Sequence, residues 1–164
     1  MTIKIMRCKV TRKAGTLLFM FIGLLSLGIK SYAQSNEVID QFLETEIASY
    51  DLSVYLVLAG AKLIPEDLPP QVALESLKQR NWGYSPEKST NPLTVGDFSF
   101  MIMKSFNISG GIMFSLFPSP WYATREFNFR RFLVNPKKAG ETMTSFEVVQ
   151  ALNNVIEWQE NQAK

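Results

Sequence analysis

The sequence contains no histidine and a single cysteine, Cys8, among its 164 residues. Without histidine, neither a Ser-His-Asp nor a Cys-His catalytic arrangement can form. Zinc sites built on cysteine or histidine are excluded for the same reason. One cysteine cannot form a disulfide within the chain, so burial of apolar side chains must stabilise the fold. We therefore expect no metal ion and no other cofactor.

Paired carboxylates leave one route to acid–base catalysis open. Glu66 and Asp67 lie in a proline-rich segment, and Glu44 and Glu46 lie on a helix that we expect to be solvated. The pattern places neither pair in an apolar setting. We expect a protein that is not an enzyme. A small carboxylate-based enzyme that acts on the cell wall is kept as an alternative.

The segment 1–33 differs in kind from the rest of the chain. A basic head over 4–13 precedes an apolar run over 16–29, and Ser-Tyr-Ala follows at 31–33. This order is typical of a secretory signal peptide, with cleavage after Ala33. An uncleaved anchor is less favoured, because the run is shorter than the about 20 apolar residues that a spanning helix needs. We expect a secreted or periplasmic protein with no membrane span after cleavage.

Removal of the 1–33 segment changes the net charge of the protein. The chain has 17 basic and 15 acidic residues, and six basic but no acidic residues lie within 1–33, so the mature chain carries 11 − 15 = −4. An acidic chain does not favour nucleic acid as a partner. Cys8 precedes the apolar run, whereas a lipoprotein needs its cysteine at the cleavage point. We therefore expect no lipid anchor.

Apolar residues recur at helical spacing through most of the mature chain, which predicts an all-α domain over 34–164. A leading helix is expected over 35–61, with a possible break at 49–51. Helices over 71–81 and 94–107 follow, separated by a polar loop.

The segment 71–107 resembles the segment 121–157 at a constant offset of 121 − 71 = 50. Each consists of a helix, a polar loop with proline and a capped helix, which predicts two tandem helix-loop-helix repeats. A partial earlier copy begins near Asp51, at an offset of 97 − 51 = 46 from Asp97. The alternative is that any two amphipathic helical hairpins look alike. The identical pairs are Ala73 and Ala123, Arg80 and Arg130, Pro86 and Pro136, Lys88 and Lys138, and Thr94 and Thr144.

The second helix of each copy begins with a capping sequence. Thr94 is followed three positions later by Asp97, and Thr144 by Glu147. The hydroxyl can accept from a free backbone N–H, and the acid suits the positive end of the helix dipole. We predict that these four residues are structural caps.

The apolar segment 108–120 joins the two copies and contains glycines and prolines that break regular structure. It is either an exposed contact surface for a partner or a linker whose side chains cover the core. We favour the linker, because so apolar a loop rarely stays exposed. The side chains expected to cover the core are Met113, Phe114, Leu116 and Phe117.

The best candidate for recognition is the sequence WYATREFNFRR over 121–131. Arginine binds carboxylate and phosphate groups, and aromatic faces bind sugars or other planar groups. A structural role is the favoured alternative, since Glu126 and Arg130 have the i,i+4 spacing of a surface ion pair. The candidate binding residues are Trp121, Tyr122, Arg125, Arg130 and Arg131.

The sequence ALESLKQRNWGYSPEKSTNPLTVGDFSFMIMKSFNI over 73–108 resembles an S-layer homology module, and the segment 122–158 resembles it loosely. That family has a Thr-Arg-Ala-Glu-like motif, whose outer positions match the four cap residues. Val95 and Ser145 replace the arginine, which in the family helps to hold an anionic wall polymer. The resemblance therefore implies a helical-repeat fold more strongly than polymer binding.

These observations favour a non-catalytic cell-envelope module that binds a wall polymer or an envelope protein. A structural subunit of an envelope assembly, with the 108–120 segment as its interface, is the second hypothesis. The wall-active enzyme is the third. An exposed 108–120 segment would favour the subunit.

Overall fold

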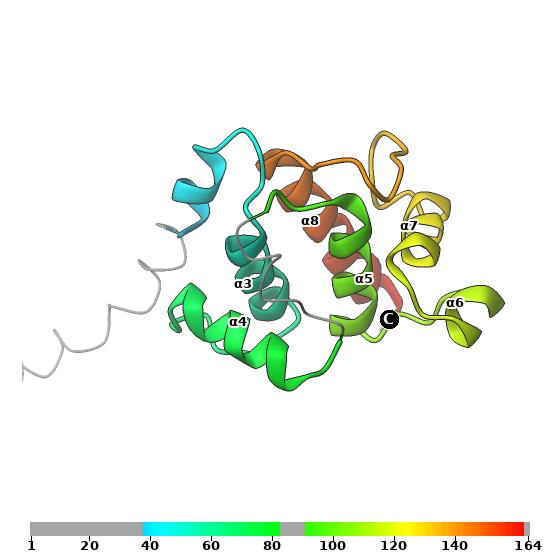
Figure 1. Ribbon diagram of the computed structural model, residues 1–164, viewed down its shortest axis with the longest axis horizontal. Helices are drawn as coiled ribbons and strands as arrows, with labels where there is room; N and C mark the ends of the chain where they lie inside the picture. The colour runs from blue at the N-terminus through cyan, green and yellow to red at the C-terminus, as the bar shows by residue number, and fades with distance from the viewer. Residues whose placement is uncertain (1–37, 83–90, 163–164) are drawn as a thin grey trace, which may run out of the picture.

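The computed structural model describes residues 38–82 and 91–162, and every regular element within these ranges is a helix (Figure 1). The all-α prediction is confirmed for this part of the chain. The predicted leader over 1–33 and most of the polar loop over 85–92 lie outside it. A helical segment ends at residue 43 and is followed by α3 (Tyr50–Gly60), α4 (Pro70–Gln79), α5 (Val95–Ser105), α6 (Ile112–Leu116), α7 (Pro120–Phe129) and α8 (Ser145–Gln162).

The prediction of one continuous leading helix over 35–61 is wrong. The chain leaves the helical conformation after residue 43, and α3 begins only at Tyr50. The Thr45 hydroxyl donates to the carbonyl of Phe42 at 2.7 Å, and Ser49 is extended. The backbone between them pairs with distant segments, so long-range hydrogen bonds compete with the helix here. The predicted break at 49–51 matches the start of α3.

Three backbone hydrogen bonds form a closed ring at the centre of the fold. Ala48 donates its N–H to the carbonyl of Met143 at 2.9 Å, Met143 donates to Leu93 at 3.0 Å, and Leu93 donates to Ala48 at 2.9 Å. All three residues are fully buried or nearly so, and each lies two positions before the start of a helix. The ring therefore brings together the N-terminal ends of α3, α5 and α8.

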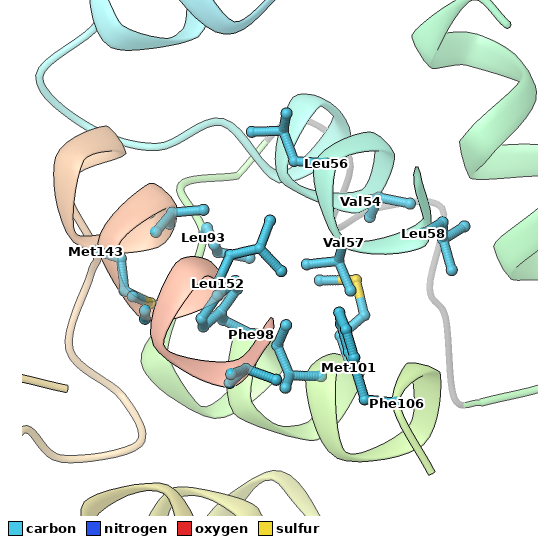
Figure 2. Packing of buried hydrophobic residues seen from close by; sticks show 14 of the residues in the cluster. Val54, Leu56, Val57, Leu58, Leu93, Phe98, Met101, Phe106, Met143 and Leu152 are labelled. Carbon is cyan, nitrogen blue, oxygen red and sulfur yellow. The ribbon is translucent and has the colours of Figure 1, made fainter. Parts of the chain in front are cut away.

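These three helices enclose the core (Figure 2). Figure 2 shows Val57 of α3, Phe98 and Met101 of α5 and Leu152 of α8 converging between the helices. α3 is apolar on almost every side, and every residue over 53–59 is buried. A helix that is apolar all round requires cover on all faces. The helices α4, α5 and α8 provide that cover.

The outer helices do not pack as the predicted hairpins require. α4 packs on α3 and α7 packs on α5, whereas α4 with α5, and α7 with α8, make little or no contact. The reason is the ring, because the extended residues before α5 and α8 turn each helix away from the helix that precedes it. The buried faces nevertheless agree at the predicted offset, since Ala73 and Leu77 of α4 correspond to Ala123 and Phe127 of α7.

Candidate functional site

The four predicted cap residues lie where the sequence placed them. The Thr94 hydroxyl accepts from the backbone N–H of Asp97 at 3.2 Å and donates to its carboxylate at 2.9 Å. The Thr144 hydroxyl accepts from the N–H of Glu147 at 3.2 Å, and the Glu147 carboxylate accepts from the N–H of Thr144 at 2.9 Å. The second cap is therefore a complete capping box, as its glutamate allows.

Glu147 also holds the loop that precedes α8. Both of its carboxylate oxygens contact the Lys137 ammonium, Oε2 at 2.7 Å and Oε1 at 2.6 Å. Burial acts to raise the pKa of Glu147, but the hydrogen bonds from Lys137 and Thr144 and the charge of Lys137 outweigh it and lower the pKa below 4.5. A lowered pKa suits a structural carboxylate, whereas a general acid needs a raised one.

Trp121 and Arg125 lie on the same face of α7 and contact each other. Ser119 caps α7 by accepting from the N–H of Tyr122, and Pro120 follows at the first helical position. One helical turn separates Trp121 from Arg125, and the guanidinium carbon lies 5.1 Å from the centre of the indole ring. Tyr122 packs edge-on against the same indole at 4.9 Å. Trp121, Tyr122 and Arg125 therefore form one exposed to half-buried group on α7.

Arg130 does not belong to this group. Its Nη2 donates to the carbonyl of Ser109 at 2.6 Å, and its guanidinium lies 5.0 Å from the Trp158 ring centre. The prediction of an ion pair between Glu126 and Arg130 is wrong. The Glu126 carboxylate instead accepts from the N–H of Gly111 at 2.8 Å.

Arg80, 50 positions before Arg130, makes matching contacts. Its Nη2 donates to the carbonyl of Leu63, and its guanidinium lies over Trp82. Both arginines follow the last helical residue of an outer helix, α4 or α7, and both tie it to the segment that follows the helix on which it packs, α3 or α5. The identity at this offset therefore has a structural explanation.

Arg131 is the next residue in the chain and is exposed, with a φ of 58°. A residue in this left-handed conformation ends a helix in the Schellman arrangement. The accompanying bond runs from the N–H of Phe132 to the carbonyl of Phe127 at 3.1 Å. The chain turns away from α7 at this point, so the five predicted binding residues do not form one site.

Most of the 108–120 segment is exposed, which contradicts the favoured prediction that its four large apolar side chains cover the core. It contains a helix, α6, that the sequence reading missed, and only Phe114 of the four expected side chains is buried. Met113, Leu116 and Phe117 are each more than half exposed. The hydrogen bond from Gly111 to Glu126 ties the start of α6 to α7. So short a helix has too few inward positions to bury all of its apolar side chains.

A groove of about 530 Å³ lies between α6 and α7. Two of its residues were missed by the sequence reading, Ile112 at 78% exposed and Phe129 at 84% exposed. The groove also contains Met113, Tyr122 and Arg125 from the predicted segments. We call the side chains Ile112, Met113, Leu116, Phe117, Trp121, Arg125 and Phe129 the α6–α7 surface.

A usable signal for this surface was present in the sequence. Gly110 and Gly111 on one side and Pro118 and Pro120 on the other restrict the apolar run to a very short helix, which cannot bury it. Phe129 gave no such signal, because its exposure depends on where α7 ends relative to α6.

Comparisons of the chain with protein-family models, with curated proteins and with solved structures find no match. None of the helices in the ranges 38–82 and 91–162 is both long and apolar enough to cross a membrane.

Proposed function

We propose that this chain is a non-catalytic module of the cell envelope that holds an envelope protein through the α6–α7 surface. The sequence of the 1–33 segment supports export to the periplasm or the exterior. The observation that carries the proposal is the exposure of six large apolar side chains on α6, directly after it and on α7, all more than half accessible. Exposed apolar surfaces are typical of sites for protein partners.

We also propose that the chain is a tandem helical repeat with an S-layer-homology-like plan. Support comes from the matched contacts of Arg80 and Arg130 and from the matched caps before α5 and α8. The ring residues add a third copy, since Leu93 follows Ala48 at an offset of 93 − 48 = 45 and Met143 follows Leu93 at 143 − 93 = 50. The first of these offsets is shorter by one than the sequence comparison indicated.

An envelope protein suits this surface better than a wall polymer does. Val95 and Ser145, which occupy the position of the arginine in the S-layer homology motif, are 0% and 1% exposed. Neither position offers a cation to an anionic polymer. The Trp121 ring is a poor platform for a sugar, because the Arg125 guanidinium covers one face and Tyr122 packs against it.

The test is pelleting of the processed protein with envelopes of its host, with Phe129→Ser as the variant. The matched control is Phe146→Ser, because Phe146 is also exposed, at 66%, but lies on α8. We expect Phe129→Ser to weaken pelleting about tenfold, as truncation at an interface anchor does. Phe146→Ser should pellet as the wild type does, and circular dichroism should show both folds intact.

Protease treatment of the envelopes separates the two partner classes. Loss of binding after protease supports a protein partner. Equal pelleting of both variants, or binding to protein-free wall sacculi that Phe129→Ser does not weaken, would contradict the proposal.

A further inference from the structure

Among the described residues, the α6–α7 groove has two cations in or beside it, Arg125 and Lys104, and one carboxylate, Glu126. Within the described residues, no carboxylate pairs with Arg125, whose contact is the Trp121 ring. Glu126 lines the same groove, but its carboxylate accepts the N–H of Gly111. Lys104 adds a second cation beside the groove, 6.0 Å from the ring centre of Phe114. A partner for this groove should therefore combine apolar side chains with at least one carboxylate.

The loop over 65–69, with the sequence PEDLP, offers this combination on the same chain. Glu66 and Asp67 are exposed, and no ion pair within the structurally described ranges engages either carboxylate. Pro65 and Pro69 are exposed on either side of them, and Leu68 is half-buried. The loop thus presents two negative charges between apolar groups.

Two hydrogen bonds to backbone carbonyls hold the loop and the segment just before it in place. The buried Tyr55 hydroxyl donates to the carbonyl of Glu66, and the Arg80 guanidinium donates to the carbonyl of Leu63 just before the loop. Burial raises the pKa of Tyr55, and the negative charges of Glu66 and Asp67 raise it further. A preorganised segment loses little conformational entropy on binding.

The loop cannot reach the groove of its own chain. It precedes α4, and Figure 1 shows α4 and α6 at widely separated positions around the central helices. Any contact between loop and groove therefore joins two molecules.

We propose that the 65–69 loop of one copy docks into the α6–α7 groove of a second copy, with Glu66 or Asp67 against Arg125. This inference rests on the proposed function and names its protein partner as another molecule of the same chain. The contact uses two different surfaces, so it is heterologous and leaves a free groove and a free loop at the ends of every assembly.

A symmetric dimer through the groove alone is disfavoured by charge. A two-fold axis through the α6–α7 surface would place the two copies of Arg125 close together. Like charges that face one another across an interface cost free energy, whereas the loop brings opposite charges to the same place.

The experiment is sedimentation of the processed full-length protein over a range of concentrations, at low and at high salt. We expect species larger than a dimer that grow with concentration and shrink as salt rises, because exposed charges are screened. Arg125→Glu, which disables the groove, and the double variant Glu66→Gln with Asp67→Asn, which removes the charges of the loop, should each weaken self-association about tenfold or more. The control Glu160→Lys changes an exposed acid on α8 and should leave association unchanged.

Mixing the groove variant with the loop variant identifies a heterologous contact. The groove variant still has a wild-type loop, and the loop variant still has a wild-type groove. A one-to-one mixture should therefore form a dimer that cannot grow, although each variant alone stays monomeric. Circular dichroism establishes that both variants are folded.

Three results would overturn the inference. They are a wild type that stays monomeric at all concentrations, a closed dimer that the loop variant leaves intact, and a mixture that stays monomeric. A monomeric protein whose envelope pelleting is still lost in Phe129→Ser would leave the proposed function standing and assign the groove to a different envelope protein.

Discussion

The backbone N–H of Gly96 donates to the carbonyl oxygen of Ala139 at 2.8 Å, which ties the loop before α8 to the first turn of α5. A Cβ at position 96 would lie 2.9 Å from that oxygen and 3.2 Å from the Cβ of Ala139. The oxygen belongs to the backbone, so it cannot move without shifting the loop. Glycine is needed at this position because the two segments approach so closely.

We predict that Gly96→Ala lowers the free energy of unfolding by about 1–3 kcal/mol, the usual cost of overpacking. The loss should occur although alanine favours a helix over glycine by about 1 kcal/mol. The urea denaturation midpoint measures it. The control is Gly140→Ala, where an added Cβ meets nothing within 4 Å and should leave the midpoint unchanged.

The cap of α8 provides a second prediction. Thr144→Ala removes the acceptor for the N–H of Glu147 and should cost about 1 kcal/mol, the usual loss at an N-cap. Thr142→Ala, two positions earlier and exposed, is the control and should stay within about 0.5 kcal/mol of the wild type. An unchanged midpoint for Thr144→Ala would show that the hydroxyl is not the cap.

The Glu147 carboxylate should make stability depend on acid pH. Its pKa in the folded protein is below the ordinary value of 4.5. Stabilisation is therefore fully present above pH 4.5 and is lost as pH falls through the folded pKa. The gap in denaturation midpoint between the wild type and Glu147→Gln should be widest above about pH 5 and should narrow steadily below about pH 4.

Lys137→Met tests the partner of this carboxylate. It should remove a large part of the same pH dependence, because Lys137 supplies both a hydrogen bond and a charge to Glu147. A gap that stays constant from about pH 3 to about pH 6 would show that Glu147 titrates alike in the folded and unfolded chain.

Arg125 and Arg130, two of the three arginines in the predicted cluster, should respond differently to substitution. Arg130→Ala should lower the free energy of unfolding by about 1–2 kcal/mol, since it removes a charge-assisted hydrogen bond to Ser109. Arg125→Ala should stay within about 0.5 kcal/mol of the wild type, because the residue is exposed. Thermal denaturation of both variants is the measurement. Equal stability would contradict the structural role of Arg130.

Processing of the N-terminus is a separate prediction from the sequence. Protein recovered from the host should begin at Gln34, because Ala33 is small and the preceding apolar run is short. Intact-mass measurement decides this. A mass that includes the 1–33 segment would argue for retention of the leader.

Local patterns were sufficient to predict the caps before α5 and α8. Thr94 and Thr144 were recognised as caps because a hydroxyl followed three positions later by an acid satisfies free N–H groups of the same helix, and no distant residue is involved. The end of the first helix after residue 43 was not recognised. It depends on Ala48, whose backbone bonds to Met143 and Leu93, far away in the chain.

The candidate site was predictable only in part. The i,i+4 spacing of Trp121 and Arg125 guarantees that they share a helix face, and the structure confirms their contact. The role of Arg130 could not be read from spacing, because its partners Ser109 and Trp158 come from other segments. The exposure of Phe129 could not be predicted either, since the residue lies in a pattern equally typical of buried residues.

By itself, the sequence determined the helical class and the caps before α5 and α8. It also excluded histidine-dependent catalytic arrangements and zinc sites built on cysteine or histidine. Each of these follows from residue type or from contacts within one helical turn. Only the tertiary structure decided that α4 packs on α3 and α7 on α5, and that the α6–α7 surface remains exposed. An apolar helix face shows that the helix needs a packing partner but does not identify that partner. The backbone ring of Ala48, Leu93 and Met143 determines which helices pack together, because it directs α3, α5 and α8 into the core and leaves α6 outside it.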